Sequence, residues 1–108
     1  MAVTIHPENS VVTHINVFAT TPDRQQALVD SLLETVKAAR EVPGWISASI
    51  HRSFDGRQVV NYVQFKDHDA AQRVTRHLLA GGYIQRNTAL GRVAPGQYEV
   101  AHTMEARD

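Results

Sequence analysis

The apolar residues of this 108-residue chain switch between the two-residue period of a strand and the 3.6-residue period of a helix. The order of these switches restricts the possible folds more than any single motif does. It predicts a strand, a helix, two strands, a helix and a final strand. The predicted strands are residues 11–19, 45–53, 57–65 and 97–104, the second helix is 68–79, and residues 83–90 form a short extra helix.

Residues that begin and end helices and turns stand at the borders of these segments. Thr21-Pro22-Asp23 predicts the start of the first helix, with Thr21 as its cap, and Pro43-Gly44 predicts its end. Asp67 is expected to cap the second helix. Asp55-Gly56 indicates a tight turn, so the second and third strands should pair as an antiparallel hairpin.

The predicted order is that of a ferredoxin-like split βαβ unit, an α+β fold with a four-stranded antiparallel sheet. Right-handed crossovers place both helices on one face of this sheet. The other face is then open, and in the expected register it carries Val60, Tyr62, Gln64 and Trp45. A half-solvated sheet is one interpretation. Because exposed aromatic residues are a liability for a monomer, we favour a homodimer whose sheets pack face to face.

Composition excludes several classes of function. Lys plus Arg and Asp plus Glu both number 11, and a net charge of zero offers no electrostatic basis for binding nucleic acid or an anionic membrane. Cysteine is absent from the sequence, which excludes disulfides, thiolate catalysis and cysteine-ligated metals. No apolar run approaches the ~20 residues that span a bilayer. We therefore expect a soluble cytoplasmic protein with a single domain over residues 1–108, comprising an N-terminal arm (1–10) and a polar tail (105–108).

Two asparagines on predicted strands are the first candidates for a functional site. If the apolar residues of the second strand face the helices, hairpin pairing turns Asn61 and Phe65 of the third strand to the same side. On the first strand, either His14, Asn16 and Phe18 or the alternate residues face the helices, and register alone does not decide between them. Asn16 and Asn61 are then either hydrogen-bonded core amides or the polar groups of a mostly apolar cavity.

Four features in combination resemble the antibiotic biosynthesis monooxygenase family, and most closely its small anthrone-type oxygenases of aromatic polyketide pathways. They are the helix end EVPG at 41–44, Trp45 directly after it, the Asp55-Gly56 hairpin and the strand VVNYVQF at 59–65. The resemblance covers residues 11–104. It implies a dimeric α+β barrel that oxidises a phenolic anthrone with molecular oxygen to a quinone and water, without a cofactor.

The resemblance also implies roles for individual residues. Asn61 matches an asparagine used by such oxygenases on the third strand, Asn16 matches one on the first strand, and Arg86 matches an arginine that faces the pocket. These three residues are the predicted catalytic groups. A tryptophan is typical of the family at the position of Phe65, and a tyrosine at that of Ala71, so an indole N–H and a phenol are replaced here. The residues predicted to contact the small aromatic substrate are Phe65, Phe18, His14, Tyr83 and His77.

The sequence holds six histidines, which are dispersed and show no metal-binding spacing, so we predict no metal site. A haem-binding or haem-degrading relative of the same fold is an alternative, because Asn16 and His77 could mimic its asparagine and its axial ligand. A non-catalytic member that binds a small molecule, and a lactone isomerase or cyclase, are further alternatives. His14 is a candidate base if it points inward.

Overall fold

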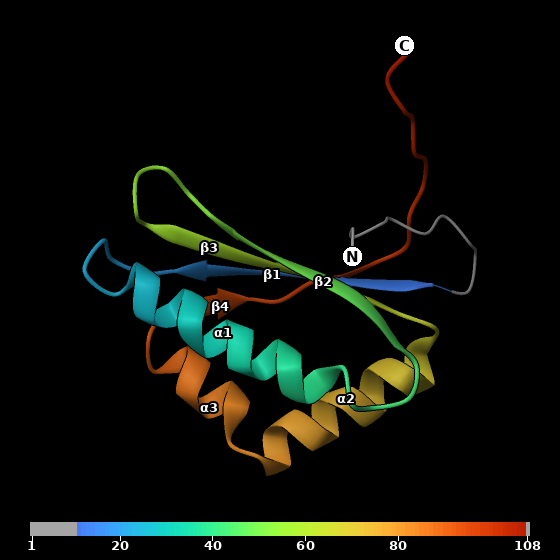
Figure 1. Ribbon diagram of the computed structural model, residues 1–108, viewed down its shortest axis with the longest axis horizontal. Coiled ribbons are helices and arrows are strands. Elements are labelled where there is room, and N and C mark those ends of the chain that lie inside the picture. The colour runs from blue at the N-terminus through green and yellow to red at the C-terminus, as the bar shows by residue number, and fades with distance from the viewer. Residues whose placement is uncertain (1–10, 108) are drawn as a thin grey trace.

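A five-stranded antiparallel sheet with all helices on one face forms the body of the protein in the computed structural model, which describes residues 11–107 (Figure 1). The N-terminal arm predicted over residues 1–10 lies outside the described residues. The elements are β1 (Val12–Ala19), α1 (Gln25–Ala39), β2 (Trp45–Arg52), β3 (Gln58–Phe65), α2 (His68–Ala80), α3 (Tyr83–Thr88), β4 (Arg92–Ala94) and β5 (Gln97–Tyr98). Within the part of the chain that is described, no helix is long and apolar enough to cross a membrane.

The strand order β2-β3-β1-β4, with β5 also paired to β1, confirms the predicted ferredoxin-like α+β fold. The first and last strands are neighbours although they are far apart in the sequence, as the split βαβ arrangement requires. None of the helices within residues 11–107 lies on the other face of the sheet (Figure 1).

From Ser47 to Arg52, β2 pairs with β3 in the predicted register. Ile50 pairs with Asn61 and Ala48 with Val63, so Asn61 faces the helices. Gly56 at the turn has a φ of +80°, a conformation that favours glycine. The pairing of β1 with β3 decides which side chains of β1 face the helices, a question that the sequence left open. Asn16 lies directly opposite Asn61, and paired residues of neighbouring strands share a face, so the helix-facing set of β1 is His14, Asn16 and Phe18.

The prediction that Trp45 lies on the open face is wrong. The pairing of β2 with β3 shifts between Trp45 and Ser47, so that Ile46 is an extra residue without its own partner. Because side chains alternate along a strand, one inserted residue turns everything before it to the opposite face. Trp45 is therefore paired with Phe65 and packs against a core cluster under the helices.

Gln64, also expected on the open face, is fully buried. Its amide donates to Thr13 Oγ1 at 3.3 Å, across the ladder between β3 and β1. The neighbouring residues of this outer face, Val60 and Tyr62, are only partly buried.

The first helix begins later than predicted, at Gln25 rather than at Thr21-Pro22-Asp23. The Thr21 hydroxyl donates to the Asp23 carboxylate at 2.6 Å instead of capping the helix, and residues 22–24 form a turn. Gln25 Nε2 donates to the carbonyl oxygens of Ser53 and Gln58, which ties the start of α1 to the β2–β3 hairpin. By contrast, Asp67 caps α2 as predicted, since its side chain accepts a hydrogen bond from Ala70 N at 2.8 Å.

The predicted fourth strand over 97–104 is also wrong in its position. The edge beside β1 is formed by β4 and β5, which are separated by Pro95 and Gly96. Proline has no N–H to give to the ladder, so the strand is interrupted there, although Ile15 N still donates to Gly96 O at 3.0 Å. Residues 99–107 are in no regular structure and extend away from the sheet (Figure 1).

The core between sheet and helices consists of two separate apolar clusters. One joins the end of β3 to α2 and is built from Ala39, Val63, Phe65, Ala70, Ala71 and Val74. The other joins β1 and the start of β3 to α1 and is built from Phe18, Leu28, Leu32 and Val59. The two asparagines of the sheet lie along β1 and β3 between these clusters.

A substitution at Gly44 tests how closely α2 approaches the start of β2. The φ of Gly44 is +94°, and a Cβ there would overlap the side chain of Ala70. We expect Gly44→Ala to lower the free energy of unfolding by about 3 kcal/mol, because a strained backbone and a steric overlap add together. Urea denaturation measures this change.

Gly82→Ala is the matched control, since Gly82 has a φ of +78° but its Cβ would meet only the Arg86 side chain, at 3.5 Å. That variant should lose about 1–2 kcal/mol from backbone strain alone. Equal losses in the two variants would contradict the close contact between Gly44 and α2.

Candidate active site

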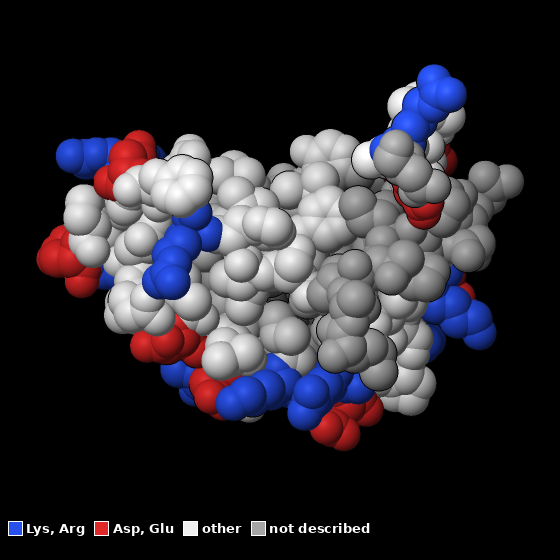
Figure 2. Space-filling model, turned by 45° about the horizontal axis from the view of Figure 1, so that its top comes forward, with Lys and Arg blue, Asp and Glu red and all other residues white. Residues whose placement is uncertain are grey.

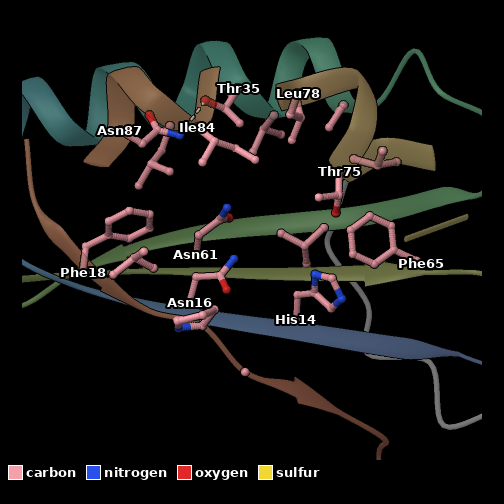
Figure 3. Close-up of a pocket in the computed structure, with 18 of the residues that line it drawn as sticks. His14, Asn16, Phe18, Thr35, Asn61, Phe65, Thr75, Leu78, Ile84 and Asn87 are labelled. Atoms are coloured by element: carbon pink, nitrogen blue, oxygen red, sulfur yellow. Dashed lines mark hydrogen bonds between the residues drawn. The ribbon is translucent and has the colours of Figure 1, made fainter. Parts of the chain in front are cut away.

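A cavity of about 480 Å³ lies between the sheet and the helices. Its walls come from β1 and β3 on one side and from all three helices on the other (Figure 3). Most of the lining is apolar, with aromatic side chains near both ends, Phe18 at one and Phe65 at the other (Figure 3). A mostly apolar cavity with a few polar groups is the usual form of a small-molecule site.

Asn16 and Asn61 form the polar part of the sheet side of this cavity. They are directly opposite each other on adjacent strands, and both side chains point toward the helices (Figure 3). Asn61 is only 7% exposed, and its Oδ1 has no hydrogen-bond partner within the described residues. A buried polar atom left unpaired costs about 1–3 kcal/mol. The interpretation of Asn61 as a satisfied core amide is therefore wrong for its oxygen, and the cavity interpretation is favoured.

A second polar group faces the asparagines from the helix side (Figure 3). Asn87 of α3 is 4% exposed, and its Nδ2 donates to Thr35 Oγ1 at 3.0 Å. Its Oδ1 accepts from Ser31 Oγ at 2.6 Å. Thr35 and Asn87 both line the cavity, and sequence reasoning missed them. The signal was a threonine at a core-facing position of an amphipathic helix, where an apolar residue is expected.

His14 stands beside Phe65 at one end of the cavity. The two rings are 4.8 Å apart and inclined at 64°, an edge-to-face contact. Burial, and then the nearby charge of His68, lower the pKa of His14 below its ordinary value. Its Nε2 is buried and has no hydrogen-bond partner in the described part of the chain. A neutral imidazole with a free ring nitrogen in an apolar cavity can accept a proton.

Trp45 is a cavity-lining residue that the sequence analysis assigned to the opposite face. Its Nε1 is buried and has no hydrogen-bond partner among the described residues. The bulge at Ile46 that brings it here leaves no mark in the apolar pattern of residues 45–53, so nothing in the sequence indicated this position.

The other predicted site residues are not brought to the cavity. Arg86 is exposed and stacks on Tyr83, with its Cζ 4.5 Å from the ring centre, and its Nη2 donates to Gly81 O. Successive helical residues point about 100° apart, and the phase of α3 directs Asn87 rather than Arg86 at the cavity. The prediction that Arg86 faces the pocket is therefore wrong.

His77 is exposed on α2 and is absent from the cavity lining. The haem alternative used His77 as the axial ligand, but the imidazole of His77 does not reach the cavity in which a haem would have to bind. Across residues 11–107, no three His, Cys, Asp or Glu side chains lie close enough together to hold a metal ion.

Comparison with known protein families gives one match. The model of the family described as antibiotic biosynthesis monooxygenase matches residues 11–79, which is more than half of the chain. The matched region contains β1, α1, β2, β3 and most of α2, and thus both asparagines of the cavity.

Individual relatives agree with this match. The tetracenomycin-F1 monooxygenase of Streptomyces glaucescens is 44% identical over 64 residues, which are 58% of this chain and 57% of that protein. The chain thus aligns with little more than half the length of this curated relative.

Solved structures show the same fold. A variant of SnoaB, a cofactor-independent oxygenase from Streptomyces nogalater, superposes with a TM-score of 0.81 at 19% identity, over 90% of this chain and 99% of that one. The ActVA-Orf6 monooxygenase of Streptomyces coelicolor, in complex with nanaomycin D, has a TM-score of 0.75 at 24% identity, over 94% and 96% of the two chains. At these identities the likeness concerns the fold.

The lowered pKa of His14 predicts a pH dependence of stability. In the unfolded chain this histidine titrates near its ordinary value of about 6.5, so between the two pKa values the unfolded state binds more protons. Stability should therefore fall as pH drops below about 6.5. We expect the melting temperature of the wild type to decrease between about pH 7.5 and about pH 5.5 by more than that of His14→Gln. The same decrease in both proteins would contradict a buried, neutral His14.

Proposed function

The chain belongs to the antibiotic biosynthesis monooxygenase family, and on this premise we propose that it is a cofactor-independent monooxygenase that oxidises a polycyclic phenolic substrate of the anthrone type to a quinone. The observation that carries the proposal is the apolar cavity in which His14 Nε2 and Asn61 Oδ1 are buried without a partner among residues 11–107. Buried polar atoms are normally paired, so these two are available to pair with polar groups of a ligand. The name of the tetracenomycin-F1 relative, and the cofactor-independent oxygenase with the same fold, support this reaction class.

The proposed reaction needs no external electrons because the substrate supplies them. An anthrone loses a proton from its central methylene carbon and becomes a resonance-stabilised carbanion. The carbanion passes one electron to O₂, and the two radicals combine to a peroxide anion, which takes up a proton. The hydroperoxide then loses water and leaves a carbonyl, so that one anthrone and one O₂ give one quinone and one water.

The residues of the cavity have separate tasks in this scheme. His14 accepts the proton that leaves the substrate and returns it to the peroxide. The amide Nδ2 of Asn61, with Asn16 beside it, donates a hydrogen bond to the oxygen on which negative charge develops. Phe18 and Phe65 hold the aromatic rings and exclude bulk water. Arg86, Tyr83 and His77 have no part in this scheme, since none of them lines the cavity.

We also propose that the protein is a homodimer whose sheets pack face to face. No helix of the described residues covers the outer face of the sheet, and Val60 and Tyr62 on it are only partly buried. In Figure 2, charged side chains gather along the left, lower and right margins of the described surface, and a white area without Lys, Arg, Asp or Glu lies between them, beside the grey residues. An uncovered surface without charged side chains can be buried against a second copy at little desolvation cost.

Oxygen uptake with a simple anthrone, such as 1,8-dihydroxyanthrone, tests the activity. We expect the wild type, stripped of metals, to consume oxygen and form the quinone faster than the slow autoxidation in buffer. Asn61→Ala should retain the fold and lower turnover by at least about tenfold, because the charged oxygen loses a preorganised donor. Gln58→Ala, at the exposed start of the same strand, is the matched control and should keep wild-type turnover.

Equal turnover in Asn61→Ala and the wild type would refute the role of Asn61. Tight binding of the anthrone with no uptake above background would instead identify a binding protein without catalysis. A Soret shift on adding haemin would favour the haem alternative.

Sedimentation equilibrium at micromolar concentration tests the dimer. We expect a mass of twice the chain for the wild type, and a shift toward monomer for Tyr62→Glu, which places a charge on the proposed interface. Only monomer in the wild-type sample would contradict the proposal.

A further inference from the structure

The unpaired polar atoms of the protein are concentrated in one place. Within residues 11–107, three buried side-chain atoms lack a hydrogen-bond partner: His14 Nε2, Trp45 Nε1 and Asn61 Oδ1. All three residues line the same cavity. Folded proteins pair nearly all of their buried polar atoms, because an unpaired one costs free energy. Three such atoms around one cavity therefore indicate partners that arrive with a ligand.

Trp45 has a particular position among them. The bulge at Ile46 turns its side chain to the helix side, opposite Phe65 on the neighbouring strand. There it packs against the cluster that includes Phe65, Ala70 and Val74. Bulges commonly redirect a side chain beside a functional site. The packing restricts the ring, so the direction of the indole N–H is set before a ligand binds.

The chemistry of these atoms defines the complementary ligand. An indole N–H can only donate, so its partner must be an acceptor such as a carbonyl or phenolate oxygen. The amide oxygen of Asn61 can only accept, so its partner must be a donor such as a hydroxyl. The remaining lining is largely apolar and suits flat rings.

We propose that Trp45 is a substrate-binding residue, whose indole N–H donates a hydrogen bond to a carbonyl or phenolate oxygen of a hydroxylated aromatic ketone or quinone. This inference rests on the proposed function, since it takes the cavity as the substrate site. It adds a specificity determinant on β2, where Trp45 Nε1 donates to an acceptor at the Phe65 end of the cavity. Asn61 Oδ1 accepts from a donor of the ligand, a role separate from that of Asn61 Nδ2 toward the charged oxygen.

A purely structural role for Trp45 makes the opposite prediction for one variant. If the indole only fills space, Trp45→Phe lowers stability and affects binding only through that loss. If the N–H is reserved for the ligand, removal of the unpaired buried donor offsets the packing lost with the smaller ring, so the denaturation midpoint stays nearly unchanged while binding weakens.

The experiment uses the single tryptophan of the sequence as its own probe. In ¹⁵N-labelled wild-type protein, the one indole N–H resonance is followed during titration with 1,8-dihydroxyanthraquinone. We expect the indole proton to move downfield and to exchange more slowly with water as the hydrogen bond forms. Trp45→Phe should bind the quinone about 5–10-fold more weakly, as expected for one lost hydrogen bond, with its denaturation midpoint nearly unchanged.

Val59→Ala, in the second core cluster and outside the cavity lining, is the matched control. It removes apolar packing from that cluster and should lower the denaturation midpoint, while the indole resonance still shifts on binding. This pattern is the reverse of that expected for Trp45→Phe.

An indole resonance that stays unmoved at saturating quinone, or equal affinity in Trp45→Phe and wild type, would overturn the inference. These measurements need no turnover and are therefore separate from the oxygenase proposal. If the wild type binds the quinone through Trp45 but consumes no oxygen with an anthrone, the function fails and the inference stands. If it oxidises the anthrone and Trp45→Phe does so with unchanged KM, the inference fails alone.

Discussion

The apolar face of the sheet must be covered by helices. The helices pack closely on it at its two ends and not along its whole length. One cluster joins α1 to Phe18 and Val59, and the other joins α2 to Val63 and Phe65. Between them lies the Asn16–Asn61 pair, which apolar side chains of the helices cannot cover without leaving polar atoms unpaired. The cavity follows from this constraint, since the helices rest on the two clusters and leave open the space above the amides.

The unpaired polar groups of the cavity lower the stability of the protein but are available to bind a ligand. Three buried atoms of the cavity have no partner within the part of the chain that is described: Asn61 Oδ1, Trp45 Nε1 and His14 Nε2. An unpaired polar group that is fully buried costs about 1–3 kcal/mol of stability. The same apolar surroundings lower the pKa of His14 and keep it neutral, as a proton acceptor must be. A ligand that pairs these atoms recovers the lost free energy, so the pattern of unpaired donors and acceptors also specifies what binds.

Local signals predicted a large part of this structure. Asp55-Gly56 set the hairpin, and the hairpin register correctly turned Asn61 and Phe65 toward the helices. The family resemblance assigned a role to Asn16, but periodicity alone did not decide which face of β1 is turned toward the helices. At two positions another interaction outweighed the local sequence signal. Thr21 bonds to Asp23 instead of capping α1, and Pro95 interrupts the edge strand that the alternating residues after it had suggested.

The sequence by itself determined the order of the elements, the hairpin register and the placement of Asn61, because each depends on periodicity and turn chemistry within a few residues. Tertiary structure alone decided which face of β1 is buried, that Ile46 bulges and turns Trp45 inward, and that Asn87 rather than Arg86 reaches the cavity. Each of these depends on a shift of one residue in strand register or helix phase. Such a shift is set by packing between segments distant in the chain, and it changes the face of a side chain without changing the local pattern.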